Sequence, residues 1–430
     1  MVFGVYGDPR SQIAMEGDIN SDVVTIRVGE PEDELTELTV SCTDKVGLGC
    51  DLASVVLEFG LNVVKGDFLT DGRWCHVVFW VETTRCTHAV SWPLLKERMT
   101  AVCPSLEISL TPRIPTPAKQ DVFLLQVRSA DRMGLLNDVT QLLWENELTV
   151  HKVNICTSPD NSAVDLFYIT DNRNELPKKR RRLDVLQCIR DPLGDDVTCD
   201  ITLAAPEFAA SIGSAHVAPE GCLPGALAPH LAEGPMTSSF EEDEGIEATE
   251  VSIDNGMSRL HSALQVSTRD RKGLLYDCLR TLKDVNIQVA YGRIALREAG
   301  LLDIDFFIRH PSGHKVTDPK AQRDLCGRLR QELERPIRLV VAPRGPDTEL
   351  LVAAPVEVNG RSRPRMFYDC TLGLRRANAC VFQADISRHA VNNKHWEVHR
   401  FLVQDSTGQP ITSPQRRQQI AKTVRSLLIG

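Results

Sequence analysis

The stretch Ala130-Asp131-Arg132-Met133-Gly134-Leu135 decides the fold, because two other segments of the chain repeat its pattern. These are Thr43-Asp44-Lys45-Val46-Gly47-Leu48 and Arg269-Asp270-Arg271-Lys272-Gly273-Leu274, and all three read x-D-(K/R)-x-G-L. Each copy follows a short β-rich apolar run and precedes apolar residues at helical spacing. An internal repeat of this kind indicates an array of one small structural unit.

The unit can be extended beyond the loop. Two β-like runs follow each helix, then a polar helix and a last apolar strand. In the second copy they are predicted at 148–156, 163–170, 182–189 and 197–203, and in the third at 285–296, 302–309, 319–333 and 337–341. The resulting order is βαββαβ, the split unit of ferredoxin-like folds. The sequence therefore predicts an α+β protein built from tandem modules.

A fourth copy emerges when Asp277 is aligned with Asp369 and Asn286 with Asn378. Its loop has Ser362 in place of the acid and Arg365 in place of the glycine, so we expect a degenerate module. The sequence ends where its last strand should follow, and the run 23–28 is predicted to complete that sheet. The expected layout is a tail (1–21), module 1 (22–112), module 2 (119–204), a flexible acidic linker (205–258), module 3 (259–343) and degenerate module 4 (347–430).

The spacing between loop and second strand divides the four copies into two pairs. It is longer in the first two copies, from Gly47 to Asn62 and from Gly134 to Thr149, than in the others, from Gly273 to Asn286 and from Arg365 to Asn378. This predicts that modules 1 and 2 pack together and that modules 3 and 4 pack together. Proteolysis near residues 214–244 should then release two stable halves.

The loop motif combines groups that suit a zwitterion. A glycine turn that enters a helix presents several backbone N–H groups at one point, and these favour a carboxylate. The aspartate beside them can accept a hydrogen bond from an ammonium group. The alternative is that the aspartate caps the helix and the glycine only makes the turn.

The D-(K/R)-x-G-L loop, the start of the second strand and the tandem arrangement resemble the ACT domain, and more specifically the plant ACR family of ACT-repeat proteins. The resemblance implies a non-catalytic regulatory fold without cofactor or metal, whose modules pair edge to edge within the chain and can also homodimerise. It implies an amino-acid (nitrogen-status) sensor that acts on an unidentified protein partner. The ligand-facing residues that it implies are Asp44, Gly47, Leu48 and Asn62, then Asp131, Gly134, Leu135 and Thr149, then Asp270, Gly273, Leu274 and Asn286.

Composition limits the partners and the compartment. A net charge of -9 makes nonspecific binding to nucleic acid or to an anionic membrane unfavourable. No apolar run is long enough to span a bilayer, and the first twenty residues are unlike a targeting peptide. We expect a cytoplasmic protein. The basic run 178–182 leaves nuclear import open, although the first turn of a solvated helix explains it as well.

Other chemistries are less well supported. Gly47-Leu48-Gly49 lacks the third glycine of a dinucleotide loop. His389, His395 and His399 could hold a metal, but we expect them to be exposed strand residues. The thirteen cysteines include no CxxC pair and are expected to be reduced and largely buried. A uridylyltransferase would need catalytic domains for which no sequence is left, whereas a ligand-free interaction scaffold stays open as an alternative.

Overall fold

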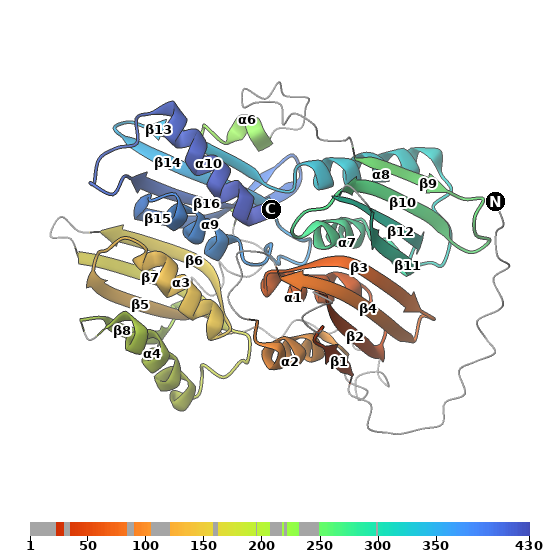
Figure 1. The fold of residues 1–430 in the computed structure, drawn as a ribbon, viewed down its shortest axis with the longest axis horizontal. Helices are drawn as coiled ribbons and strands as arrows, with labels where there is room; N and C mark the ends of the chain where they lie inside the picture. The colour runs from red at the N-terminus through yellow and green to blue at the C-terminus, as the bar shows by residue number, and fades with distance from the viewer. Residues whose placement is uncertain are drawn as a thin grey trace.

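The computed structural model describes residues 23–29, 35–83, 90–104, 121–157, 162–194, 196–206, 217–218, 222–231, 249–297 and 300–430. Two eight-stranded antiparallel sheets carry the fold, and the long helices pack on one face of each sheet (Figure 1). Sheet A has the order β1-β2-β4-β3-β11-β12-β10-β9, and sheet B has the order β13-β14-β16-β15-β6-β7-β5-β8.

The strands of sheet A are β1 (Val24–Arg27), β2 (Thr36–Thr43), β3 (Leu61–Thr70), β4 (Trp74–Thr83), β9 (Glu250–Asp254), β10 (Ser262–Arg269), β11 (Gln288–Leu296) and β12 (Leu301–Arg309). Those of sheet B are β5 (Phe123–Ala130), β6 (Leu148–Thr157), β7 (Ser162–Asp171), β8 (Thr198–Leu203), β13 (Arg338–Arg344), β14 (Asp347–Pro355), β15 (Cys380–Val391) and β16 (Lys394–Gln404).

Each module contributes a loop helix and a second helix. The loop helices are α1 (Leu48–Glu58), α3 (Leu135–Glu145), α7 (Leu274–Asp284) and α9 (Met366–Arg376). The second helices are α2 (Trp92–Val102), α4 (Lys179–Leu193), α8 (Pro319–Glu334) and α10 (Pro414–Ile429), and a short helix α6 (Ala228–Leu231) follows module 2. The repeated βαββαβ organisation predicted from the loop motif is therefore confirmed. None of the helices in the described ranges has the length and apolarity needed to cross a bilayer.

The modules pair in a different way from the prediction. Sheet A joins modules 1 and 3 where β3 runs beside β11, and sheet B joins modules 2 and 4 where β6 runs beside β15. The loop helices pair accordingly, α1 with α7 and α3 with α9. The prediction of a 1–2 pair and a 3–4 pair, and of two separable halves, is wrong. Segments far apart in the sequence complete each sheet.

The wrong pairing was predicted because Asn286 and Asn378 were assumed to begin a strand, as Asn62 and Thr149 were. All four loop helices have 11 residues, so the difference in spacing does not reflect a difference between the helices. Asn286 and Asn378 are not strand residues but the left-handed residues that end their helices, with φ of 57° and 49°. Gly60 and Glu147 hold the same place in modules 1 and 2, with φ of 70° and 59°. Asn62 and Thr149 lie two residues further on, inside their strands.

Three edge strands also differ from expectation. The run 23–28 forms β1, which pairs with β2 in sheet A instead of completing module 4. The last predicted strand of module 3 forms β13, which pairs with β14 at the edge of sheet B. The edge of sheet A beside β10 is filled by β9, within the segment predicted to be a flexible linker. In that same segment Leu227 and Leu231 are buried against sheet B.

The two helix layers meet in the middle of the molecule. Trp144 of α3 donates a hydrogen bond to the carbonyl of Glu58 at 3.0 Å, and its ring contacts Phe59 and Tyr368. Lys272 and Asp369 form a buried ion pair across the same boundary, with a distance of 2.6 Å between Nζ and Oδ2. The two sheets are therefore joined by packed side chains as well as by the chain.

Candidate functional site

Each strand-to-helix loop makes the same tight corner. The residue before the helix is Gly47, Gly134 or Gly273, and its φ of 81°, 82° or 78° is left-handed, a conformation that glycine adopts without strain. Arg365 takes the same conformation in module 4, with φ of 66°. We number these four corners by module. The fourth has kept the backbone shape although it has lost the glycine.

The basic residue of the motif has a structural role in three corners. It pairs with the acid in the first turn of its own helix: Lys45 with Asp51 at 2.8 Å, Arg132 with Asp138 at 2.7 Å and Arg271 with Asp277 at 2.7 Å. An acid at this end of a helix is also favoured by the helix dipole. This pair explains why a lysine or arginine follows the aspartate in every copy of the motif.

Because the modules pair, each corner lies against the end of the partner module's loop helix. The penultimate residue of that helix is the one in contact: Leu57, Trp144, Lys283 or Arg375. A Cβ on Gly47 would lie 2.9 Å from Lys283 Cε, and one on Gly134 would lie 3.0 Å from Arg375 Nε. The partner helix therefore presents a cation to corners 1 and 2, whereas it presents Leu57 to corner 3 and Trp144 to corner 4.

Corner 1 opens into a cavity of about 250 Å³, which we call pocket 1. Asp44 lines it and accepts a hydrogen bond from the Thr70 hydroxyl at 2.6 Å. Lys283 contacts Asp51 and Glu357, both at 3.1 Å. Burial alone would lower the pKa of Lys283, but these two carboxylates outweigh it and raise the pKa. Pocket 1 is thus lined by an acid, the left-handed glycine and a firmly charged cation.

A second cation contributes to pocket 1. Arg309, the last residue of β12, lines the cavity, and its buried Nε has no hydrogen-bond partner among the residues that the structure describes. A buried donor without a partner is unfavourable unless a ligand or water satisfies it. This donor is therefore available to an oxygen atom inside the cavity.

Corner 2 opens into a cavity of about 320 Å³, which we call pocket 2. Asp131 accepts a hydrogen bond from the Thr157 hydroxyl at 2.8 Å, as Asp44 does from Thr70. Arg375 covers Gly134 and contacts Asn137 at 3.2 Å and Asp138. The two pockets therefore share one arrangement of acid, left-handed glycine and partner cation.

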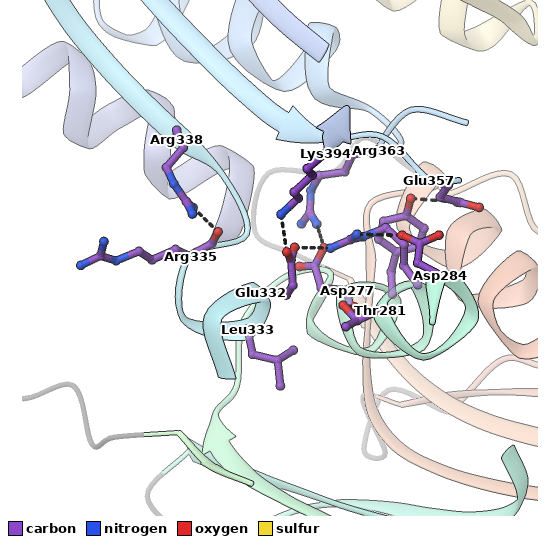
Figure 2. A network of polar contacts seen from close by, with 12 residues as sticks. Asp277, Thr281, Asp284, Glu332, Leu333, Arg335, Arg338, Glu357, Arg363 and Lys394 are labelled. Atoms are coloured by element: carbon purple, nitrogen blue, oxygen red, sulfur yellow. Dashed lines mark hydrogen bonds and ion pairs between the residues drawn. The ribbon is translucent and has the colours of Figure 1, made fainter. Parts of the chain in front are cut away.

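Corner 3 is filled by the protein itself. Asn62 of the partner strand donates to Asp270 at 2.8 Å, and the Arg363 guanidinium lies over Gly273. Figure 2 shows Arg363 directed at Asp277, with which it forms a buried ion pair. Burial raises the pKa of Asp270 to about 6 although the Asn62 bond lowers it. Oδ2 of Asp270 is thus bound to a residue of the partner module, whereas its buried Oδ1 has no hydrogen-bond partner among the described residues.

Corner 4 is also filled. Ser362, which replaces the acid, donates to the buried Glu397. The Arg365 guanidinium lies 5.1 Å from the ring centre of Trp144 and 4.6 Å from that of Tyr368, and its Nε donates to Asp369 at 3.0 Å. Aromatic stacking and an ion pair thus occupy the volume that is open in corners 1 and 2.

The twelve predicted site residues do not all lie in open pockets. Asp44, Gly47 and Leu48 line pocket 1, and Asp131, Gly134 and Leu135 line pocket 2. Asp270, Gly273 and Leu274 form the closed corner 3, to which Asn62 also contributes. Thr149 donates to Asn172, and Asn286 is an exposed helix end. Neither Thr149 nor Asn286 is among the residues that line the two pockets.

Sequence reasoning missed the partner cations. Lys283 and Arg375 have the same position in their modules, because each is the penultimate residue of its loop helix, α7 or α9. Comparing this position across the four copies would have shown two cations and two apolar residues. Their function becomes visible only when the pairing of modules is known.

The remaining sequence candidates have structural explanations. The second glycine of Gly47-Leu48-Gly49 packs on Phe68, since a Cβ there would lie 2.9 Å from the ring. His389 and His399 are buried and not exposed as expected, with hydrogen bonds to Ser387 and Glu397. No group of three His, Cys, Asp or Glu side chains in the described ranges could hold a metal. The twelve cysteines that the structure describes are free.

The basic run 178–182 is the first turn of α4. Arg181 is directed inward, where it forms an ion pair with the buried Asp171 and donates to the carbonyl of Asn146. At least one of the five basic side chains is thus used in packing module 2.

The chain matches three protein-family models. Residues 250–347 match the "ACR9-like, ACT-like domain", residues 348–430 match "ACT domain-containing protein ACR9, C-terminal", and residues 26–104 match "ACT domain-containing protein ACR10, N-terminal". The matches fall on modules 3, 4 and 1.

Relatives extend the similarity to nearly the whole chain. ACT domain-containing protein ACR9 of Arabidopsis thaliana is 39% identical over 419 residues, which are 96% of this chain and 100% of that protein. ACR10 of the same plant is 39% identical over 95% of this chain and 99% of its own length. A bifunctional uridylyltransferase/uridylyl-removing enzyme of Cereibacter sphaeroides is 38% identical over 85 residues, 20% of this chain and 9% of the enzyme. The repeated fold and these full-length similarities together show that the chain belongs to the plant ACR family of ACT-domain regulatory proteins.

Proposed function

We propose that this protein is a non-catalytic regulatory protein that binds free amino acids in pockets 1 and 2. One observation carries the proposal. In both pockets the aspartate that follows the strand, a left-handed glycine and a cation from the partner helix line the same cavity, and the cation lies against the glycine. This arrangement is complementary to the ammonium and carboxylate groups of a zwitterion.

The roles follow from the chemistry of each group. Asp44 and Asp131 accept hydrogen bonds from the ligand ammonium. The ligand carboxylate is bound by backbone N–H groups of the first turn of α1 or α3 that have no acceptor within the helix, and by Lys283 or Arg375. The N–H groups of Leu48 and Leu135 are not among them, because they donate to the carbonyls of Lys45 and Arg132. Because the cation comes from the other module, a bound ligand contacts both modules of a pair. Occupancy therefore stabilises the paired arrangement over any separated one.

Pocket 1 is also connected to the boundary between the sheets. Lys283 contacts Glu357, which in turn accepts a hydrogen bond from the Tyr276 hydroxyl at 3.0 Å. Glu357 belongs to the segment between β14 and α9, and the next residue, Val358, donates its N–H to Asp284 at 3.0 Å. A carboxylate that attracts Lys283 competes with Glu357, so ligand binding alters a contact that holds sheet B against α7. This gives the protein a means of reporting occupancy.

The second candidate function is a ligand-free interaction scaffold. It is favoured by corners 3 and 4, where the protein's own Arg363 and Arg365 fill the site. A scaffold gives no reason, however, for the paired acid and cation in corners 1 and 2. Ligand binding to the full-length chain decides between the two functions.

The experiment is a screen of the common amino acids by thermal unfolding, followed by calorimetry on any that bind. A ligand at ten times its dissociation constant should stabilise the native state by about 1.4 kcal/mol. For a unit of the size of one sheet with its helices this corresponds to roughly 3 to 6 °C. If no amino acid at millimolar concentration shifts the melting temperature or gives heat, the binding proposal fails and the scaffold replaces it.

Matched variants locate the sites. Asp44→Asn and Asp131→Asn keep the shape of the side chain and remove its charge. Each should therefore lower the affinity of its own pocket for the amino acid by roughly tenfold or more. Asp270→Asn is the control, because Asp270 has the same position in the motif but is bound to Asn62 in a closed corner. An equal effect of all three substitutions would show that the open pockets are not the binding sites.

A further inference from the structure

Asp165 is a buried acid of β7. It occupies a strand position at which modules 1 and 3 have aliphatic residues. It lies opposite Val127 of β5, four residues before the loop aspartate. The equivalent residue opposite Val40 in module 1 is Val77, and the one opposite Val266 in module 3 is Ile304. Both are fully buried. An apolar core position has therefore been replaced by a carboxyl group in module 2 alone of these three.

The fold does not compensate this carboxyl. Asp165 is 2% exposed, and its Oδ1 has no hydrogen-bond partner among the described residues. Burial raises its pKa to about 7, and the carboxylate of Asp131 contributes to the rise. A buried acid without a partner destabilises the folded state, so its presence beside a cavity points to a ligand.

Asp165 lines pocket 2, and no cation of that pocket is directed at it. Asp131, directly after β5, is an acid near it, and Cys380 of β15 also lines the cavity. Arg132 of the corner and Arg375 of α9 both pair with Asp138. Asp405, after β16, accepts hydrogen bonds from Thr407 and from the backbone of Gln409. The interior of the pocket is therefore acidic.

The position of Asp165 assigns it to the ligand side chain. The groups expected to bind the ammonium and carboxylate are nearer to solvent, because Asp131 and Gly134 are only partly buried and Arg375 is exposed. Asp165 lies on the core face of the sheet and is more deeply buried. A ligand side chain that extends from these groups into the core is therefore expected to reach Asp165, which lines the same pocket.

We infer that pocket 2 selects an amino acid whose side chain ends in a cation, such as lysine, ornithine or arginine, and that Asp165 binds this second positive charge. The inference rests on the proposed function and adds the ligand class. A charge-assisted hydrogen bond in a buried site favours such a ligand over a neutral one of the same length. Pocket 1, with Val77 at the equivalent strand position, lacks this feature.

The test compares L-lysine with L-norleucine, which lacks only the terminal ammonium, by titration calorimetry on the full-length chain. Wild-type protein should bind lysine at least about tenfold more tightly in one class of sites. Asp165→Val should abolish that preference and keep norleucine binding, and Asp165→Asn should remove most of it. Asp200→Asn, which removes an exposed acid of β8 in the same module, should leave the preference intact.

The outcomes separate the inference from the proposed function. Equal affinities for lysine and norleucine in the wild type, or a lysine preference that survives in Asp165→Val, would overturn the role of Asp165 while amino-acid binding stands. Failure of every amino acid to bind would overturn both. Thermal unfolding of the unliganded variants shows whether they are folded, and Asp165→Asn retains the size of the original side chain if Asp165→Val should fail to fold.

Discussion

Replacing Asp165 by valine should stabilise the unliganded protein, and the gain should be larger at pH 8 than at pH 5. The pKa of this carboxyl rises from 3.8 to about 7 on folding, because the side chain is buried beside Asp131. The folded state therefore holds a proton that the unfolded chain loses between these values. The resulting cost is absent below about pH 3.8, grows as the pH rises, and levels off above about pH 7.

The magnitude follows from about 1.4 kcal/mol for each unit of pKa difference. About three units give roughly 4 kcal/mol at pH 8, whereas only about 2 kcal/mol of this cost has developed at pH 5. The valine variant carries none of it. Hydrophobic burial of valine adds a further gain, but that gain does not depend on pH, so the difference between the two pH values isolates the carboxyl.

Urea unfolding followed by circular dichroism at pH 5 and pH 8 measures this difference. The free energy of unfolding of the variant relative to the wild type should increase by about 2 to 3 kcal/mol between the two pH values, with the same dependence on urea concentration. An identical stability difference at both pH values would refute the reasoning, because it would mean that Asp165 ionises in the folded protein as easily as in water.

Three other perturbations test the fold and the corners. Gly134→Ala should lose about 1 to 2 kcal/mol in thermal unfolding, because its φ of 82° strains an L residue and the new Cβ meets Arg375; an unchanged stability would argue against the left-handed corner. After cleavage at a protease site inserted between residues 232 and 248, the two fragments should co-elute in gel filtration, since β3–β11 and β6–β15 join residues on both sides of the cut; separate peaks would contradict the interleaved pairing. Lys272→Met should cost about 2 to 3 kcal/mol because it leaves Asp369 buried with one cation fewer, whereas a loss as small as that of an exposed ion pair would show that the boundary between the sheets contributes little.

The unit of the fold could be predicted from the sequence, but its assembly could not. The loop motif marked three corners, and the alignment of Asp277 with Asp369 marked the fourth, where Arg365 indeed replaces glycine in an unchanged backbone. The prediction of which modules pair was wrong, because similarity between two copies indicates their common ancestry and does not show that they are in contact. Whether β3 runs beside β6 or β11 depends on side chains from both modules, and a single sequence does not reveal which ones meet.

The same limit applies to the site. The aspartate and glycine of each corner are local in sequence, and the residues predicted there line both pockets. Lys283 and Arg375 reach the corners only through the pairing of modules. Nothing local distinguishes the open corner at Asp131 from the closed one at Asp270. The difference lies in the partner residues, Arg375 in one case and Asn62 in the other.

The alternation of modules between the two sheets has a consequence for synthesis. The edge of β3 finds its neighbour only when β11 has been made, and module 2 has to be translated in between. At about 5 to 20 residues per second the ribosome needs roughly ten to forty seconds for that interval. For that time the nascent chain exposes an unpaired strand edge, which is prone to pair with other chains. The yield of folded protein should therefore depend on the rate of translation and on the local concentration of other nascent chains.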